Sequence, residues 1–301
     1  MIKKAQENDI RGLQELYAKT YSPQFVAHYF TSVFKPFNTY VIKDNTAIVS
    51  TLAVHRHPVW LNGKKINVSY LNFLFTAYEY RSLNYTETMI SEVMEEMIYN
   101  DLLTFISCAD AQPFISWDFH NIYQRKSYLL SRNQLPVYSQ FGITADVPIG
   151  ELTNLYQHFM CYFDGYRHRD KDYYQNKLQE ISATGRKLIG CFNRQNDLEG
   201  YLIYDPKTDP LEIKEIIYLN SGALLKLLSY VLNQARVIKF TLSAGENLAR
   251  IIPTAIYNTN DQLMVRMNDL ELFNRLYGSD IKSVSEAFRM SGKPVNFNEE
   301  Y

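Results

Sequence analysis

The sequence has few cysteines, little glycine and no excess of either charge. Its three cysteines, Cys108, Cys161 and Cys191, are odd in number and widely spaced, which argues against a disulfide framework and against a cysteine metal site. Lysine plus arginine number 31 and aspartate plus glutamate 32, so a formal charge of −1 gives no general attraction to nucleic acid or anionic lipid. We therefore expect no nucleic-acid partner.

Long apolar runs are also missing. The longest nearly unbroken stretch, at about Tyr70 to Phe75, is far too short to cross a bilayer. The first residues turn polar at Lys3, without the apolar core of a secretion signal. These features predict a soluble, cytoplasmic protein with no membrane partner.

What the chain has instead is an ordinary globular composition with many aromatic residues. Hydrophobic residues make up 46% and charged residues 21%, which excludes a disordered chain or a coiled coil. There are 24 tyrosines and 17 phenylalanines against 12 glycines. Tyrosine lines polar pockets as well as cores, so its abundance is compatible with a ligand site.

Hydrophobic periodicity predicts one order of elements over residues 2–148. The order is strand, two helices, three strands, helix, strand, helix and strand. The expected ranges are 2–5, 9–17, 23–34, 39–42, 46–55, 65–76, 86–98, 102–108, 115–124 and 128 onward. A strand, a helix and a strand in succession favour a right-handed crossover, so part of the sheet should be parallel.

The second half repeats part of that order. Strands at 187–193, 199–204 and 211–219 precede a helix at 222–234 and a strand at 237–242. We expect an α/β (α+β) protein with two tandem domains of similar fold, each with a mixed, partly parallel central sheet. The predicted divisions are 1–147, 148–270 and a short C-terminal helix and tail, 271–301.

The turn after strand 65–76 resembles a known cofactor loop. Thr76, Glu79, Tyr80 and Arg81 agree with the pattern V-x-T-x-P-E-Y-R-G-x-G, motif A of the GCN5-related N-acetyltransferases (GNAT) of the Eis-like branch. Tyr78 replaces the proline, and Ser82 and Asn84 replace the two glycines. The resemblance implies that acetyl-CoA is the co-substrate, bound at Phe73, Leu74, Phe75, Thr76, Arg81, Ser82, Leu83, Asn84, Tyr85 and Thr86. A helix N-terminus and an arginine suit a pyrophosphate.

Two further stretches extend the resemblance. Residues 122–128 are similar to the family's [I/F]-Y-x-R-F-G-[Y/F], which implies Tyr128 as the acid that protonates the departing thiolate and Tyr123 beside the sulfur. The family ends in a sterol-carrier-like domain whose last carboxylate acts as a base. Since about 30 residues follow Asp269 here, that domain is expected to be vestigial, with Tyr301 as the candidate carboxylate.

The resemblance implies an N-acetyltransferase that transfers an acetyl group to a primary amine of a small molecule or a lysine side chain. The second half resembles the family's second, degenerate domain and is expected to be scaffold. The alternative is a non-catalytic binding or assembly protein with a decayed CoA site.

His55 and His57 have no third ligand in sequence, so no metal is expected. Whether the chain forms a homo-oligomer stays open.

Overall fold

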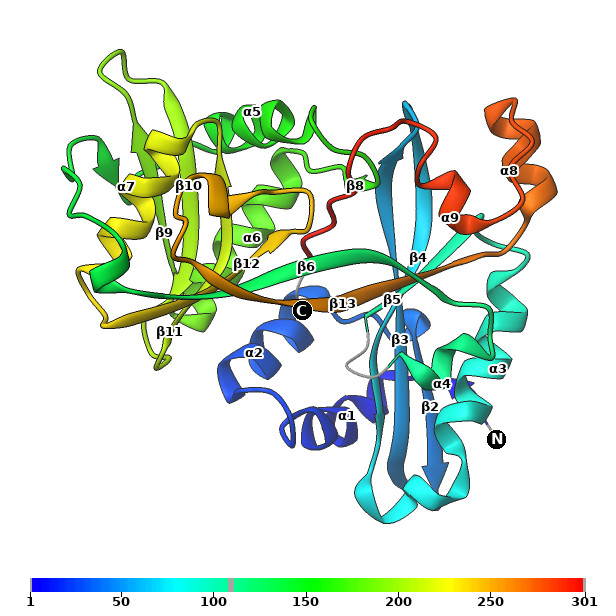
Figure 1. Cartoon of the computed structure of the whole chain (residues 1–301). Coiled ribbons are helices and arrows are strands. Elements are labelled where there is room, and N and C mark those ends of the chain that lie inside the picture. The colour runs from blue at the N-terminus through cyan, green and yellow to red at the C-terminus, as the bar shows by residue number, and fades with distance from the viewer. Residues whose placement is uncertain (1, 108–110, 300–301) are drawn as a thin grey trace.

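The computed structural model describes residues 2–107 and 111–299, and gives no side-chain account of Asp261 and Gln262. Its strands form one continuous 13-stranded sheet that runs through both halves of the chain (Figure 1). The order is β1-β2-β3-β4-β5-β13-β6-β12-β11-β10-β9-β7, with β8 paired to β3. Both parallel and antiparallel pairs occur, which confirms the predicted mixed sheet.

The first half supplies six strands and four α-helices. The strands are β1 (Ile2–Lys4), β2 (Thr39–Asp44), β3 (Ala47–Leu61), β4 (Lys64–Thr76), β5 (Leu103–Ser107) and β6 (His120–Ser131). The helices are α1 (Ile10–Tyr17), α2 (Pro23–His28), α3 (Tyr85–Met97) and α4 (Gln112–Ile115). A π-helical turn, η2 (Tyr29–Val33), continues α2, and a 3₁₀ turn, η4 (Tyr78–Leu83), precedes α3.

The second half contains the remaining elements. Its strands are β7 (Ile143–Thr144), β8 (Tyr166–Arg167), β9 (Lys187–Phe192), β10 (Leu198–Asp205), β11 (Leu211–Tyr218), β12 (Val237–Ser243) and β13 (Ile256–Met267). Its helices are α5 (Ile149–Met160), α6 (Lys171–Thr184), α7 (Ser221–Leu232), α8 (Leu270–Tyr277) and α9 (Val284–Ala287).

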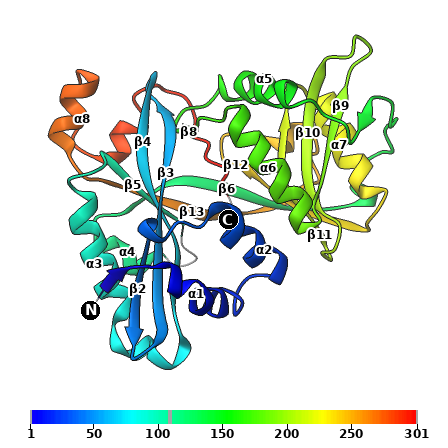
Figure 2. The ribbon, with the colours of Figure 1, turned by 180° about the vertical axis from the view of Figure 1, so that it is seen from behind.

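Each half has a helix layer on both faces of the sheet. The apolar stripe predicted for residues 86–98 is buried on α3 and packs on β3, β4 and β5, whereas α1 and α2 cover the opposite face. In the second half, α7 covers one face and α5 and α6 cover the other, as the view from behind shows (Figure 2). The periodicity therefore identified the covering helices correctly.

Strand β13 joins the two halves. It comes late in the chain, yet it lies between β5 and β6, with Val265 opposite Phe105 on one side and His120 on the other. Strand β6 pairs with β13 along its length and with β12 from Arg125 to Ser131. Because the strands of the two halves are exchanged in this way, the sheet does not divide at the predicted boundary of 147, which stays a prediction.

One predicted element is wrong. A helix was expected at 115–124, but α4 ends at Ile115, and Asp118 has a left-handed φ of 62° that stops helical continuation. The chain then enters β6 at His120, eight residues earlier than the predicted strand. Tyr123 and Arg125 are buried on one face of β6, since pairing with β13 on one side imposes a period of two.

The C-terminal segment has no separate core. Phe273 of α8, Phe288 after α9 and Phe297 of the tail belong to one apolar cluster with Phe105 of β5. These three side chains therefore pack on the first half, while Pro294 and Asn296 also bond to Asp164 of the second half.

We predict that Val265→Ala destabilises both halves together. Val265 is fully buried on the strand that joins them, so losing two methyl groups should cost about 2 kcal/mol and leave one unfolding transition. Both tryptophans, Trp60 and Trp117, lie in the first half, so fluorescence reports that half, while circular dichroism reports the whole chain.

The two denaturation midpoints should coincide and shift together. The control is Val137→Ala, at a side chain that is 71% exposed, which should leave both midpoints unchanged. Separate midpoints for the two signals would mean that β13 does not couple the halves.

Candidate active site

Strand β4 carries a bulge beside the predicted cofactor loop. Thr51 pairs with Phe75 and Ala53 with Asn72, so two residues of β4, Phe73 and Leu74, lie opposite one residue of β3. Phe73 has a φ of 52°, a strained conformation for an aromatic residue. Strain of this kind persists only where the surroundings enforce it, and it marks this point of the strand as a functional candidate.

The bulge also lies where β4 and β5 separate. Among the described residues, their parallel register runs only from Ser69 opposite Thr104 to Leu71 opposite Ile106. Beyond Leu71, β4 continues to Thr76, paired with β3 alone. The β5-side edge of Leu74–Thr76 is thus a place where an extended ligand can lie along the strand.

The loop after β4 is held by a chain of hydroxyl groups. Thr76 Oγ1 lies 2.9 Å from Ser50 Oγ and 3.0 Å from Thr86 Oγ1, which ties the end of β4 to the first turn of α3. Arg81 Nε donates to the carbonyl of Thr76 at 3.4 Å. These bonds close the turn, so the start of α3 faces the bulged end of β4.

The N-terminus of α3 is available to an anion. Asn84 has a φ of 53° in the left-handed region, and its side chain makes no capping hydrogen bond to the first turn. Asparagine adopts left-handed geometry more readily than most residues, so Asn84 can stand where the family pattern has a glycine. Arg81, Ser82 and Leu83 are exposed, the last by 52%, while Tyr85 stacks on Tyr80 with ring centroids 6.3 Å apart.

The donor set fits a pyrophosphate in part. Uncapped amides at the start of a 13-residue helix and one exposed guanidinium are the groups that such an anion needs. Glu79 and Glu87 flank the loop, however, and their charges oppose an anion. The loop therefore offers a site with one arginine as its cation within residues 77–87.

The matching turn in the second half is closed. There, Asn220 Oδ1 accepts the backbone N–H of Ala223 and so caps α7. Tyr218 at the end of β11 donates to Glu246 at 2.7 Å, and Glu246 accepts the N–H of Ser243 at the end of β12, so side chains bridge the gap between these two strands. This arrangement supports the expectation that the second half is scaffold.

A pair of buried histidines lies next to the bulge. His55 and His57 of β3 have ring centroids 6.4 Å apart, and His55 Nδ1 lies 3.0 Å from Asn72 Oδ1, one residue before Phe73. Burial lowers the pKa of His55 to about 4 and that of His57 well below its usual value, and the nearby Arg167 acts in the same direction. Both rings are neutral at physiological pH.

The two tyrosines predicted near the thiol, Tyr123 and Tyr128, both lie on β6. Tyr123 is buried against Phe105 and Phe297, and its hydroxyl donates to the carbonyl of Gly165 at 2.5 Å. Tyr128, five residues along β6, faces the other side of the sheet and stacks on Phe240 of β12 in the core under α7. Burial raises the pKa of Tyr128 to about 12. Neither placement supports the predicted role, and Tyr301 lies outside the described residues.

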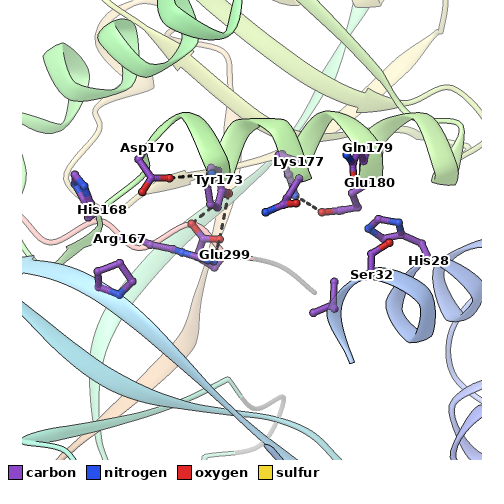
Figure 3. Close-up of a pocket in the computed structure, with 13 residues that line it drawn as sticks. His28, Ser32, Arg167, His168, Asp170, Tyr173, Lys177, Gln179, Glu180 and Glu299 are labelled. Atoms are coloured by element: carbon purple, nitrogen blue, oxygen red, sulfur yellow. Dashed lines mark hydrogen bonds and ion pairs between the residues drawn. The ribbon is translucent and has the colours of Figure 1, made fainter. Parts of the chain in front are cut away.

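The described surface has a cavity of about 400 Å³ between α2–η2 of the first half and α6 of the second (Figure 3). Tyr173, Lys177 and Glu180 point into it from one face of α6, opposite His28 and Ser32. Further lining residues are Val33, Pro58, Arg167, His168, Asp170, Asn176, Gln179 and Glu299. The cavity thus draws its walls from both halves and from the tail.

Turn η2 takes part in both the cavity and the packing around the bulge. Tyr29 precedes the cavity residues on η2, and its ring lies 4.6 Å from that of Phe73 and 6.2 Å from that of His55. Lys177, Glu180 and Glu299 were not predicted from the sequence. Tyr173, Lys177 and Glu180 recur every three or four residues along α6, and this polar spacing was the available signal for a solvated helix face.

Comparisons with known proteins agree with this architecture. A family model described as an acetyltransferase (GNAT) domain matches residues 1–112, and a second with the same description matches residues 165–266. The chain carries two tandem GNAT domains. No curated protein sequence matches it significantly.

Several solved structures share the fold of both GNAT domains. A protein of unknown function from Enterococcus faecalis, described as a probable N-acyltransferase, gives a TM-score of 0.74 at 16% identity, over 91% of this chain and 73% of that one. A GCN5-related N-acetyltransferase from Anabaena variabilis gives 0.71 at 15%, over 90% and 73%. Eis1 from Mycobacterium abscessus gives 0.65 at 10%, over 90% and 75%. At these identities the likeness establishes the fold alone.

Two features are absent from the described residues. Within residues 2–107 and 111–299, no three histidine, cysteine, aspartate or glutamate side chains are grouped so that they could hold a metal ion. No helix in the same ranges has both the length and the apolar character needed to span a membrane.

We predict that acid weakens the fold through the histidine pair. In the unfolded chain His55 has a pKa near 6.5, whereas in the fold it is about 4. As the pH falls below 6.5, the unfolded state therefore gains a proton at His55 that the folded state does not bind, and the free energy of unfolding drops by about 2 kcal/mol from this residue by pH 5. His57 acts in the same direction. Denaturation at pH 7 and pH 5 measures this drop.

The variant His55→Gln removes one titrating ring, so its stability should depend less on pH by about that amount, although it is less stable at pH 7. Parallel pH curves for the two proteins would contradict a neutral, buried His55.

We predict that Tyr128→Phe leaves acetyl transfer within about twofold of the original rate. A general acid contributes about 10²–10⁴-fold, whereas Tyr128 packs in the core beneath α7 and the titratable groups that act on its hydroxyl are Tyr257 and Glu246 of the second half. Release of free thiol from acetyl-CoA measures the turnover. A hundredfold loss, with unfolding unchanged, would return Tyr128 to the role that the sequence resemblance implied.

Proposed function

We propose that the chain is an acetyl-CoA-dependent N-acetyltransferase of the Eis-like branch, with its one donor site in the first GNAT domain. The observation that carries the proposal is the asymmetry between the two domains. The first has a bulged β4, an edge of that strand beyond its pairing with β5, and an uncapped α3. In the second, Asn220 and Glu246 fill the same positions.

The donor would be held along β4 and at the start of α3. Acetyl-CoA supplies an activated thioester carbonyl. Leu74–Thr76 present the strand edge that would hold an extended chain, while Arg81 and the amides of Tyr85 and Thr86 would hold the phosphates. The α3 apolar stripe fixes that helix on the sheet, so these donors need no rearrangement to meet the anion.

The acceptor amine would come from the cavity between α2 and α6. Ser32 and Val33 of η2 line the cavity, and Tyr29, at the start of the same turn, packs on Phe73 at the bulge. An amine attacks only in its neutral form, so a protonated amine must first give up a proton to a group of the protein or to water. The cavity offers a carboxylate and an imidazole that can accept a proton through water, Glu180 and His28.

A non-catalytic binding protein on the same fold is the second candidate. Two observations favour it: Ser82 and Asn84 stand where the family has glycines, and the hydroxyls of Tyr123 and Tyr128 are bound or buried away from the bulge. Such a protein would bind a small molecule in the cavity and leave acetyl-CoA unchanged.

Calorimetry with acetyl-CoA, followed by thiol release with a panel of amines, separates the two candidates. The enzyme should bind acetyl-CoA at micromolar to low millimolar concentration and release thiol faster when an amine is present. Absence of both heat and release at millimolar acetyl-CoA would leave the binding protein as the function.

We predict that Arg81→Ala raises the KM for acetyl-CoA about tenfold and leaves kcat nearly unchanged. The guanidinium contributes one charge-assisted contact to a phosphate, worth about 1.5 kcal/mol, far from the reacting carbonyl. Arg11→Ala is the control, since Arg11 is an exposed arginine on α1 paired only with Glu15. Equal effects of the two substitutions would remove Arg81 from the phosphate site.

A further inference from the structure

Asn72 lies on β4 directly before the strained bulge, and its side chain shares a face of the sheet with that of Phe73. His55 of β3 contacts both residues: its Nδ1 lies 3.0 Å from Asn72 Oδ1, and its ring lies 6.1 Å from the ring of Phe73. Successive side chains of a regular strand point to opposite faces. The bulge therefore turns two neighbouring side chains toward the same side of the sheet, the side that α1 and α2 cover.

The bond to His55 fixes the orientation of the Asn72 amide. An amide oxygen can only accept, so the proton of this bond is on His55 Nδ1. His55 is 8% exposed, and its pKa of about 4 keeps the ring neutral at physiological pH. Because Oδ1 is held by the ring, the amide turns its NH₂ end away from His55 and cannot rotate without losing this bond.

The Nδ2 group of Asn72 is a buried donor that the fold does not use. It is enclosed from solvent, and it has no hydrogen-bond acceptor among residues 2–107 and 111–299. A buried donor that is left unpaired costs free energy, so such a group in a folded protein calls for an acceptor from a ligand or from ordered water. Asn72 thus offers two N–H bonds beside the bulge.

Asn72 also lies between the two places assigned above to the donor and to the acceptor. The strand edge Leu74–Thr76 begins two residues further along β4. On the other side, the ring of His55 is 6.2 Å from that of Tyr29, the first residue of η2, and the last two residues of η2 line the cavity. An acyl group that reaches from the strand edge toward the cavity would pass this amide.

We propose that Asn72 is a catalytic residue whose Nδ2 donates a hydrogen bond to the carbonyl oxygen of the acyl thioester. This inference rests on the proposed function, because it takes acetyl-CoA to lie along the edge of β4. When the neutral amine attacks, its lone pair forms the C–N bond and the C=O pair moves onto the oxygen. That pair re-forms the carbonyl as the C–S bond breaks. The thiolate leaves with the C–S electrons, and the proton lost by the amine nitrogen reaches it through water.

The Asn72 amide transfers no proton in these steps; it acts on the charge of the oxygen. That oxygen is only dipolar in the bound thioester, whereas it carries nearly a full negative charge after the attack. A donor that His55 already holds in place stabilises this charge without reorganising. Its hydrogen bond is therefore stronger in the transition state than in the bound substrate, and it should raise kcat more than it lowers KM.

The experiment compares Asn72→Ala and Asn72→Asp with the original full chain by thiol release with the panel of amines. Both variants should lower kcat about hundredfold and leave the KM for acetyl-CoA within about threefold. Alanine removes the whole amide, whereas aspartate keeps an acceptor oxygen for His55 and has no N–H at neutral pH. If Asn72→Asp kept the original kcat, Asn72 would serve only to hold His55, and the proposal would be overturned.

Asn67→Ala is the matched control. Asn67 is an exposed asparagine of the same strand, five residues before Asn72 and opposite Pro58 of β3. Its truncation should leave both kcat and KM unchanged. Equal losses in Asn67→Ala and Asn72→Ala would show that any truncation on β4 lowers the rate, which also overturns the assignment of the amide.

The infrared band of the thioester carbonyl tests the contact without turnover. Acetyl-CoA labelled with ¹³C at the carbonyl is added, without an amine, to the original protein and to Asn72→Ala. A hydrogen bond weakens the C=O bond, so the labelled band should lie at lower wavenumber in the original protein. Identical bands in two proteins that both bind acetyl-CoA would place Nδ2 away from the carbonyl oxygen and overturn the proposal.

Two results distinguish failure of this inference from failure of the proposed function. If the original protein transfers acetyl groups and Asn72→Ala transfers them at the same rate, the function stands and Asn72 has no catalytic role. If no amine accelerates thiol release but the carbonyl band lies lower in the original protein than in Asn72→Ala, the hydrogen bond stands and the reaction does not.

Discussion

The site depends on β13, a strand from the second half of the chain that pairs with two strands of the first half. Strand β13 separates β5 from β6 and pairs with both, so the end of β5 is held against β13 while β4 continues beyond its pairing with β5. The same exchange sends β6 across to β12. Because backbone pairing fixes both domains to one sheet, α2 of the first and α6 of the second are held face to face, and a cavity between them can be rigid.

The two domains show how one fold separates a binding site from a scaffold. Both place a helix after the fourth strand of their sheet, and both helices bury a continuous apolar face. In α7 the first turn is satisfied by Asn220, whereas in α3 a left-handed Asn84 leaves it without a side-chain cap. The capped N–H groups at the start of α7 stabilise the domain but have no donor left for a ligand. Only the uncapped start of α3 therefore retains the capacity to bind an anion.

Sequence reasoning recovered what depends on local pattern. The stripe of α3 and most strands of both halves follow from periodicity. The order of strands did not follow, because β13 and β5 are far apart in sequence and no local signal selects their pairing. The sequence placed Tyr123 in a helix and Tyr128 in the strand after it, whereas both lie on β6, where residues five apart face opposite sides. Their proposed roles stay predictions.

The tail cluster was equally invisible, since Arg125, Arg169, Glu215 and Glu299 meet from four distant segments. Buried ion pairs are a poor source of stability, because desolvation offsets most of their attraction, and an apolar cluster of the same volume would hold the tail as well. What an apolar cluster cannot do is place a charge at a chosen point of a cavity wall. Arg169, stacked on Tyr156 and paired on every donor edge, therefore keeps its charge at a fixed position between the two halves and the tail.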